Sequence, residues 1–203
     1  MQPFILTREQ LLTDLYVAYY DARRHKRHKP YQQKFEEHLV DNLESLCTEL
    51  YERMYKPQPS TCFLISDPKK REVFAADFRD RIVHHLYYNY THELLERTFI
   101  QDSYSCIKGR GTHYGINRLE RHIRQESQNW QMPCWVLKMD IRGYFMHINR
   151  ERLLSIMFYQ LDRMASHRMD AIRTWGECLD MNFLRYLTHE IVLIDPTVGC
   201  RIK

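Results

Sequence analysis

The chain has 203 residues, of which 44% are hydrophobic and 28% are charged, so it can bury the core of one ordinary domain or of two small ones. It contains only 6 glycines and 7 prolines, which disfavours a turn-dense β-sandwich or barrel and favours a helix-rich chain. The 6 cysteines follow no zinc-ligand spacing, so no metal knuckle is expected. Without a signal peptide or a bilayer-spanning apolar run, the sequence predicts a cytoplasmic protein with no membrane partner.

The N-terminal region is predicted to be helical. Thr7 begins the sequence TREQ, which has the form of a capping box, and residues at helical spacing follow it. A second long helix is expected over residues 31–55, where apolar residues recur at helical intervals. The prolines of KPQPS should end that helix, because each proline removes a backbone donor.

Strands and helices are predicted to alternate in the rest of the chain. A hairpin is expected over residues 62–75, with a turn at Asp67 and Pro68. Helices should begin near Asp77 and after the glycines of KGRGTHYG. The sequence CWVLKMD, residues 134–140, has the strongest strand signal. Further helices are expected at NRERLLSIMFYQL, with Asn149 as N-cap, and at CLDMNFLRYLTHEIVLI.

The net charge of +4 is unevenly distributed along the chain. Residues 23–29 (RRHKRHK) are almost continuously basic, and KKR at 69–71 and KGR at 108–110 form two tighter clusters. Such clusters suit a polyanion, although solvated surface faces would give the same pattern. The candidate nucleic-acid contacts are Arg23, Arg24, Lys26, Arg27, Lys29, Lys108 and Arg110.

Asp140 closes an apolar run and is followed by a turn through Gly143. A carboxylate at the end of a buried strand is costly unless something pairs with it. A hard metal ion such as Mg²⁺ is one partner that would suit a rigid strand end. Considered alone, this stretch is better explained by an aspartate that caps the end of the strand.

Three cations, Lys69, Lys70 and Arg71, are expected at the hairpin turn, where they could converge on a triphosphate. Arg71 is the sharpest candidate because a guanidinium bonds phosphate oxygens as a planar fork. A basic hairpin tip in solvent is the alternative. On the next helix, Arg79 and Arg81 cannot share a face, so one of them should be structural, with Asp80 as a nearby carboxylate.

A glycine-containing loop precedes the next predicted helix. Gly109 and Gly111 would let the backbone approach a phosphate, and Thr112 could cap the helix whose N-terminus then faces that anion. The spacing is that of neither a Walker loop nor a dinucleotide fingerprint. A plain loop leading into a helix is an equally good interpretation.

Taken together and in order, RDRIVHH, SYSCIKGRGTHYGINRL and LKMDIRGYFMHI resemble the bacterial reverse transcriptases. They resemble those of diversity-generating retroelements and group II intron relatives more than the viral enzymes. The similarity runs from about residue 55 to residue 154. The resemblance implies a helix-rich α+β fold that forms the fingers and part of the palm of a right-hand polymerase. An N-terminal helical region (1–55), fingers (56–133) and a partial palm (134–203) are expected.

The resemblance also implies an activity, RNA-directed DNA polymerisation, with an RNA template, a DNA primer, deoxynucleoside triphosphates and Mg²⁺. Asp140 matches the first catalytic aspartate and metal ligand, and the backbone carbonyl of Ile141 would help to hold the second ion. Phe145 matches the ribose gate, whose ring excludes a 2′-hydroxyl, unless it is a core aromatic. Lys69 (or Lys70) and Arg71 match the triphosphate-binding cations. Arg110 lies in a loop that matches a template-contacting region.

Two departures from the family pattern limit what the chain is expected to do alone. The Tyr-x-Asp-Asp motif and the Gln-Gly-type motif before it are absent, whereas a two-metal site needs carboxylates from more than one strand. The chain is therefore expected to be the N-terminal part of a longer protein and inactive by itself. Its palm strand would keep an unpaired edge and favour a homodimer. Two other classes are a non-catalytic nucleic-acid-binding module and a helical interaction domain with incidental basic patches.

Overall fold

The structure is a computed structural model that describes residues 4–24, 29–67, 70–169 and 173–203. It has a helix-rich α+β fold, as the composition predicted. The chain divides into two compact units, and we describe each by itself. Unit 1 comprises Met1–His92 and Asn149–Lys203, and unit 2 comprises Glu93–Ile148. The predicted boundaries near residues 55 and 133 stay a prediction.

The first helix of unit 1, α1 (Arg8–Arg23), begins where the capping box predicted. The Thr7 hydroxyl accepts a hydrogen bond from the Gln10 amide at 3.2 Å. The single long helix predicted over residues 31–55 is wrong, because the chain forms α2 (Pro30–Glu36) and then α3 (Leu39–Tyr51). The Asn42 side chain donates to the Phe35 carbonyl at 2.9 Å. A backbone carbonyl at the break between the two helices thus has a hydrogen-bond donor.

The break between α2 and α3 follows from aromatic packing that the local pattern does not encode. The ring of Phe35 lies 6.4 Å from that of Tyr19 on α1 and 5.3 Å from that of Phe78. The Tyr19 hydroxyl donates to Glu36. These tertiary contacts set the position of α2, whereas the leucines of α3 are buried with α1 in the main core. The two segments therefore do not continue as one helix.

The remaining helices of unit 1 begin close to their predicted starts. In α4 (Phe78–Glu96), the Asp77 carboxylate accepts from the Arg79 amide at 3.1 Å. Asn149 caps α7 (Arg150–Ala165) by accepting from the Arg152 amide at 2.9 Å. A short 3₁₀ turn, η1 (Trp175–Glu177), precedes α8 (Met181–Val192), which Asp180 caps. The core residues contributed by these later helices are Phe78, Ile82, Val83, Leu86, Phe183 and Leu187.

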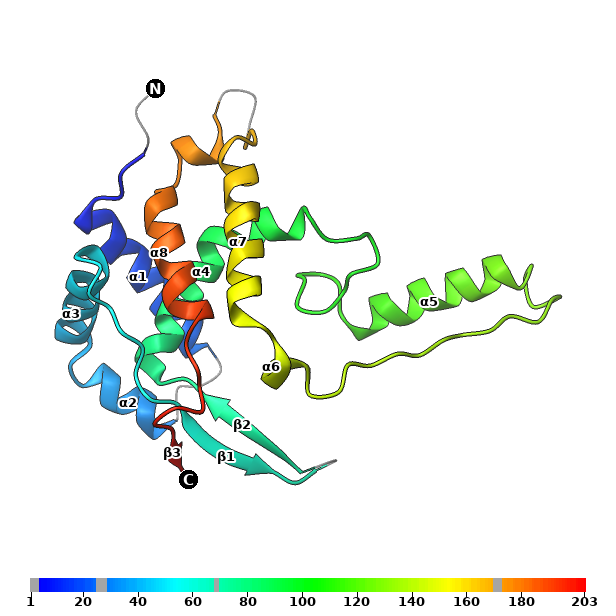
Figure 1. Cartoon of the computed structure of the whole chain (residues 1–203), viewed down its shortest axis with the longest axis horizontal. Coiled ribbons are helices and arrows are strands. Elements are labelled where there is room, and N and C mark those ends of the chain that lie inside the picture. Colours follow the sequence, from blue (N-terminus) through cyan, green and yellow to red (C-terminus); the bar gives the residue numbers. More distant parts are fainter. Residues whose placement is uncertain (1–3, 25–28, 68–69, 170–172) are drawn as a thin grey trace. The chain divides into compact units, whose positions relative to one another are not determined.

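A small sheet in unit 1 contains the predicted hairpin, which is confirmed (Figure 1). Strand β1 (Thr61–Ile65) pairs antiparallel with β2 (Arg71–Ala75). A third strand, β3 (Arg201–Ile202), pairs parallel with β1 and was not predicted. Two residues are too short for an alternating pattern, and the pairing joins positions far apart in sequence.

Unit 2 contains α5 (Thr112–Glu126) and the single turn α6 (Tyr144–His147). A long stretch without helix or strand leads from one to the other (Figure 1). The strand predicted over residues 134–140 is therefore wrong, and Trp135 within it is 96% exposed. An apolar run becomes a strand only when a neighbouring backbone pairs with it, and none of the described residues does so.

The described residues also bear on membrane insertion and on disulfide bonding. Across the described ranges, the helices include none that is both long enough and apolar enough to cross a membrane. All of the cysteines carry free thiols. The fingers-and-palm interpretation of the fold and the predicted homodimer stay proposals.

Candidate nucleotide and nucleic-acid site

Asp140 lies in the extended stretch before α6, and its predicted burial at a strand end is wrong. The residue is exposed, and its Oδ1 accepts a hydrogen bond from the Ile141 amide at 2.9 Å. Among the described residues no cation forms an ion pair with this carboxylate. One oxygen is therefore occupied locally, and the group is open to a ligand from solution.

The turn after Asp140 is fixed by a glycine. Gly143 has a φ of +60° and caps α6, a left-handed conformation that residues with a Cβ adopt at a cost. A Cβ at this position would also lie 2.7 Å from Nδ1 of His147. The predicted tight turn is present, and it places Phe145 on a helical turn with its side chain 81% exposed.

The residues near Asp140 fit a magnesium ion in kind but not in number. A carboxylate and the Ile141 carbonyl are hard oxygen donors of the type that Mg²⁺ prefers. Within the described parts of the chain, no group of three or more His, Cys, Asp or Glu residues could hold a metal ion. The remaining positions would have to come from phosphate oxygens, water or further carboxylates.

The predicted triphosphate-binding cations belong to unit 1. Lys70 and Arg71 are exposed at the hairpin tip, and Arg71 is the first residue of β2, opposite Ile65. Lys69 lies outside the described residues. Over the described part of the chain, no ion pair joins Lys70 or Arg71 to a carboxylate. Both charges are therefore open to an anion from solution.

Arg79 is structural, which confirms that one arginine of the pair would be. Its guanidinium is paired with Glu49, lies 3.6 Å from the Asp80 carboxylate and stacks 5.2 Å from the centre of the Tyr55 ring. Arg81 is also engaged: its Nε donates to the Ala76 carbonyl at 2.8 Å.

Asp80, predicted only as a carboxylate near the structural arginine, is also the buried anchor of this region. Its oxygens accept from the Tyr55 hydroxyl at 2.8 Å and from the Gln58 amide at 2.7 Å. Burial raises the pKa of the Asp80 carboxyl, and the two hydrogen bonds oppose that rise. Asp80 thus fastens the segment before the hairpin to α4.

The loop before α5 contains two cationic side chains, of which one is hydrogen-bonded within the loop and the other is exposed. Nη1 of Arg110 donates to the carbonyls of Gln101 at 3.1 Å and Ser103 at 3.3 Å, so this side chain holds the loop together. Lys108 is exposed beside Gly109, which has a φ of +77°. Of these two cations, Lys108 rather than Arg110 is therefore open to an anion from solution.

The start of α5 differs from the prediction in one respect. Gly111 is the N-cap, without a side-chain hydrogen bond, and Thr112 is the first helical residue. The expectation that Thr112 caps the helix is therefore wrong. A cavity of about 500 Å³ lies at this end of the helix, between the loop and the first two turns. The uncapped N–H groups and the helix dipole favour an anion there.

A second anchor, also missed from the sequence, ties the loop to α5. Asp102 accepts hydrogen bonds from Nε of Arg118 and, at 2.8 Å, from Nε2 of His122. The bond from Arg118 and then that from His122 lower the pKa of Asp102 to about 2. The loop that carries Lys108 is thereby fixed to the second and third turns of α5.

The basic run is only partly free to bind nucleic acid. Arg23 forms an ion pair with Glu36 at 3.0 Å, and Arg24 forms one with Asp21 at 3.3 Å. Lys29 is exposed at the start of α2. The predicted contacts Lys26 and Arg27 lie outside the described residues.

The comparisons with known proteins leave the family open. No family model matches the chain, and no curated protein matches it. The resemblance to reverse transcriptases accordingly rests on the motifs and on the groups described above.

Proposed function

We propose that the chain forms the fingers and part of the palm of an RNA-directed DNA polymerase of the bacterial retroelement type. The observation that carries this proposal is the state of Asp140. Its carboxylate is exposed, bonds only the next amide among the described residues, and precedes a glycine turn that presents Phe145. A structural aspartate would be paired, whereas this one is free to take a metal ion.

Each free group has a role in this proposal. Asp140 and the Ile141 carbonyl hold Mg²⁺, which when bound neutralises charge on the transferring phosphate. Lys70 and Arg71, together with Lys69, bind the triphosphate. Phe145 excludes nucleotides that carry a 2′-hydroxyl, by steric contact alone. Lys108 contacts the phosphate backbone of the template.

A test of the proposal is primer extension on an RNA template. A polypeptide that joins this chain to a palm bearing Tyr-x-Asp-Asp should extend a DNA primer with deoxynucleotides and Mg²⁺. The 203-residue chain by itself should incorporate no nucleotide, because two-metal transfer needs further carboxylates. Failure of the joined polypeptide, or extension by the chain alone with contaminating polymerase excluded, would contradict the proposal.

A second candidate is a nucleic-acid-binding module without catalysis. The exposed Lys108 beside the uncapped start of α5 favours it, because phosphate binding there needs no carboxylate. Both candidates predict that affinity for RNA falls steeply with salt. Only the polymerase predicts that Asp140 matters, so template-directed extension separates the two.

A further inference from the structure

The turn after α5 has an unusual backbone. Three successive residues, Gln128, Asn129 and Trp130, have φ values of +50°, +58° and +71°. The left-handed conformation costs a residue with a Cβ about 1 kcal/mol or more. None of the three is glycine, so the turn persists only because its surroundings hold it. Strain of this kind concentrates at functional sites.

Ser127 and Arg124 supply what holds the turn. Ser127 is buried, its Oγ accepts from the Trp130 amide at 2.9 Å, and its carbonyl accepts from the Met132 amide at 2.9 Å. The Arg124 carbonyl accepts from the Asn129 amide at 2.8 Å. The backbone of Trp130 is thus held on a short, hydrogen-bonded turn, yet its side chain is 60% exposed.

A cation lies beside this exposed indole. The Arg124 guanidinium carbon is 5.9 Å from the centre of the Trp130 ring, within the range of a cation–π contact. Nε and Nη2 of Arg124 donate to Oε1 of Glu120 at 3.0 and 2.8 Å, in an ion pair on the surface of α5. The ring therefore keeps open aromatic surface next to a guanidinium that is itself paired with Glu120.

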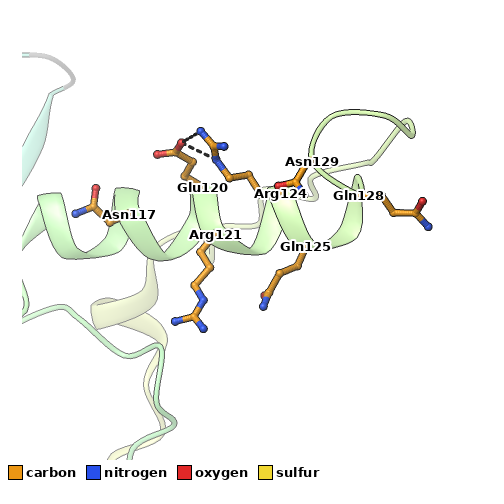
Figure 2. A pocket seen from close by; sticks show the side chains of 7 residues that line it. All are labelled: Asn117, Glu120, Arg121, Arg124, Gln125, Gln128 and Asn129. Carbon is orange, nitrogen blue, oxygen red and sulfur yellow. Dashed lines mark hydrogen bonds and ion pairs between the residues drawn. The ribbon is translucent and has the colours of Figure 1, made fainter.

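Hydrogen-bonding side chains continue from the turn along α5. They border a cavity of about 450 Å³ lined by Asn117, Glu120, Arg121, Arg124, Gln125, Gln128 and Asn129. Figure 2 shows Arg121 and Gln125 projecting from the same side of the helix, away from the Glu120–Arg124 pair. Within the described ranges, no carboxylate forms an ion pair with Arg121.

We propose that this surface, from Arg121 to Trp130, binds single-stranded nucleic acid. Trp130 stacks on an unpaired base. Such a base is accessible in a single strand, whereas the bases of a duplex are already stacked on one another. Arg121 binds a backbone phosphate, and the amides of Gln125, Gln128 and Asn129 hydrogen-bond base edges. The inference rests on the proposed function, in which this strand is the unpaired template.

The test is fluorescence anisotropy with the 203-residue chain and labelled, unstructured RNA at low salt. Trp130→Ala should weaken binding about 10-fold, the loss expected for one stacked base, and Trp130→Phe should keep most of the affinity. Trp135→Ala is the matched control, because Trp135 is also an exposed tryptophan of unit 2, and it should bind like the wild type. Arg121→Gln should lower the salt dependence of binding.

Two further arms make the outcomes distinct. A DNA oligonucleotide of the same sequence should respond to Trp130→Ala as RNA does, and a blunt duplex should not respond. If Trp130→Ala binds like Trp135→Ala while Lys108→Ala still weakens binding, this inference fails and the proposed function stands. If the duplex loses as much affinity as the single strand, stacking is wrong. If the wild type binds no nucleic acid, both proposals fail.

Discussion

The two units differ in what stabilises them. Unit 1 buries a continuous core that includes Leu15 and Leu46 at its centre. In unit 2, whose residues are all described, Leu94 is the only buried hydrophobic side chain. That unit relies instead on polar anchors such as Asp102 and Ser127. Burial provides most of the stability of a domain, so most of the folding free energy should come from unit 1. The candidate chemistry at Asp140 belongs to unit 2.

The largest expected effect contrasts two aspartates, one from each unit. In the joined polymerase, Asp140→Asn should lower the rate of extension at least ~10³-fold, because a metal ligand is lost. It should change the free energy of unfolding by less than about 0.5 kcal/mol, since the group is exposed. Primer extension and chemical denaturation measure the two quantities.

Asp80→Asn should have the opposite profile. Both oxygens of Asp80 accept hydrogen bonds, and an amide nitrogen cannot replace the oxygen that faces the Gln58 amide. The loss of stability should be about 1–3 kcal/mol. If Asp140→Asn destabilises the chain as much as Asp80→Asn, the inference that stability comes mainly from unit 1 is wrong.

A pair of leucines tests the same inference through packing alone. Leu46→Ala should lower the free energy of unfolding by about 3 kcal/mol, because it leaves a cavity in the core of unit 1. Leu119→Ala, at a position on α5 that is 50% exposed, should cost about 0.5 kcal/mol or less. Urea denaturation monitored by circular dichroism gives both values. Equal costs would show that α5 is packed in solution.

Phe145→Ala should affect selectivity without affecting stability. The ring is exposed in this chain, so its removal leaves no cavity. In the joined polymerase it should relax discrimination between deoxynucleotides and ribonucleotides by about 10-fold, the scale of a steric pocket contact. The ratio of kcat/KM for the two nucleotide types is the measurement, and an unchanged ratio would exclude Phe145 as the ribose gate.

The smallest expected effect is a difference in how the two units respond to acid. The hydrogen bonds from Arg118 and His122 lower the pKa of Asp102 to about 2 in the folded chain, below the unfolded value of about 3.9. Its contribution to stability is therefore present above pH ~4 and lost as the pH falls towards 2. Burial raises the pKa of Asp80, so its ionised form costs stability that acid relieves. Carboxyl NMR titration should find Asp80 titrating well above Asp102.

Local signals could be read from the sequence, and long-range partners could not. Thr7 and Asn149 cap their helices as predicted because a cap and its target lie three residues apart. The break before Leu39 depends on packing between separate helices. The strand predicted over residues 134–140 is absent because strand formation requires a partner that no apolar pattern supplies.

The same limit applies to the candidate site. Its basic residues could be named from their clustering, but which of them are free could not. Arg110 and Arg23 are engaged within the fold, whereas Lys108 is open to solvent. The aromatic surface at Trp130 was missed because left-handed residues without glycine leave no signature in sequence.

The pairing of β3 with β1 has a consequence for the order in which the sheet is completed during synthesis. The β1–β2 hairpin needs only neighbouring residues, whereas β3 follows Thr61 by about 140 residues. At ribosomal speeds of roughly 5–20 residues per second, β1 waits several seconds with an open edge. The amide of Arg201 then donates to the Ser60 carbonyl at 2.8 Å. The nascent chain therefore carries an unprotected strand edge until Arg201 and Ile202 leave the ribosome, and we expect chaperones to bind it during that interval.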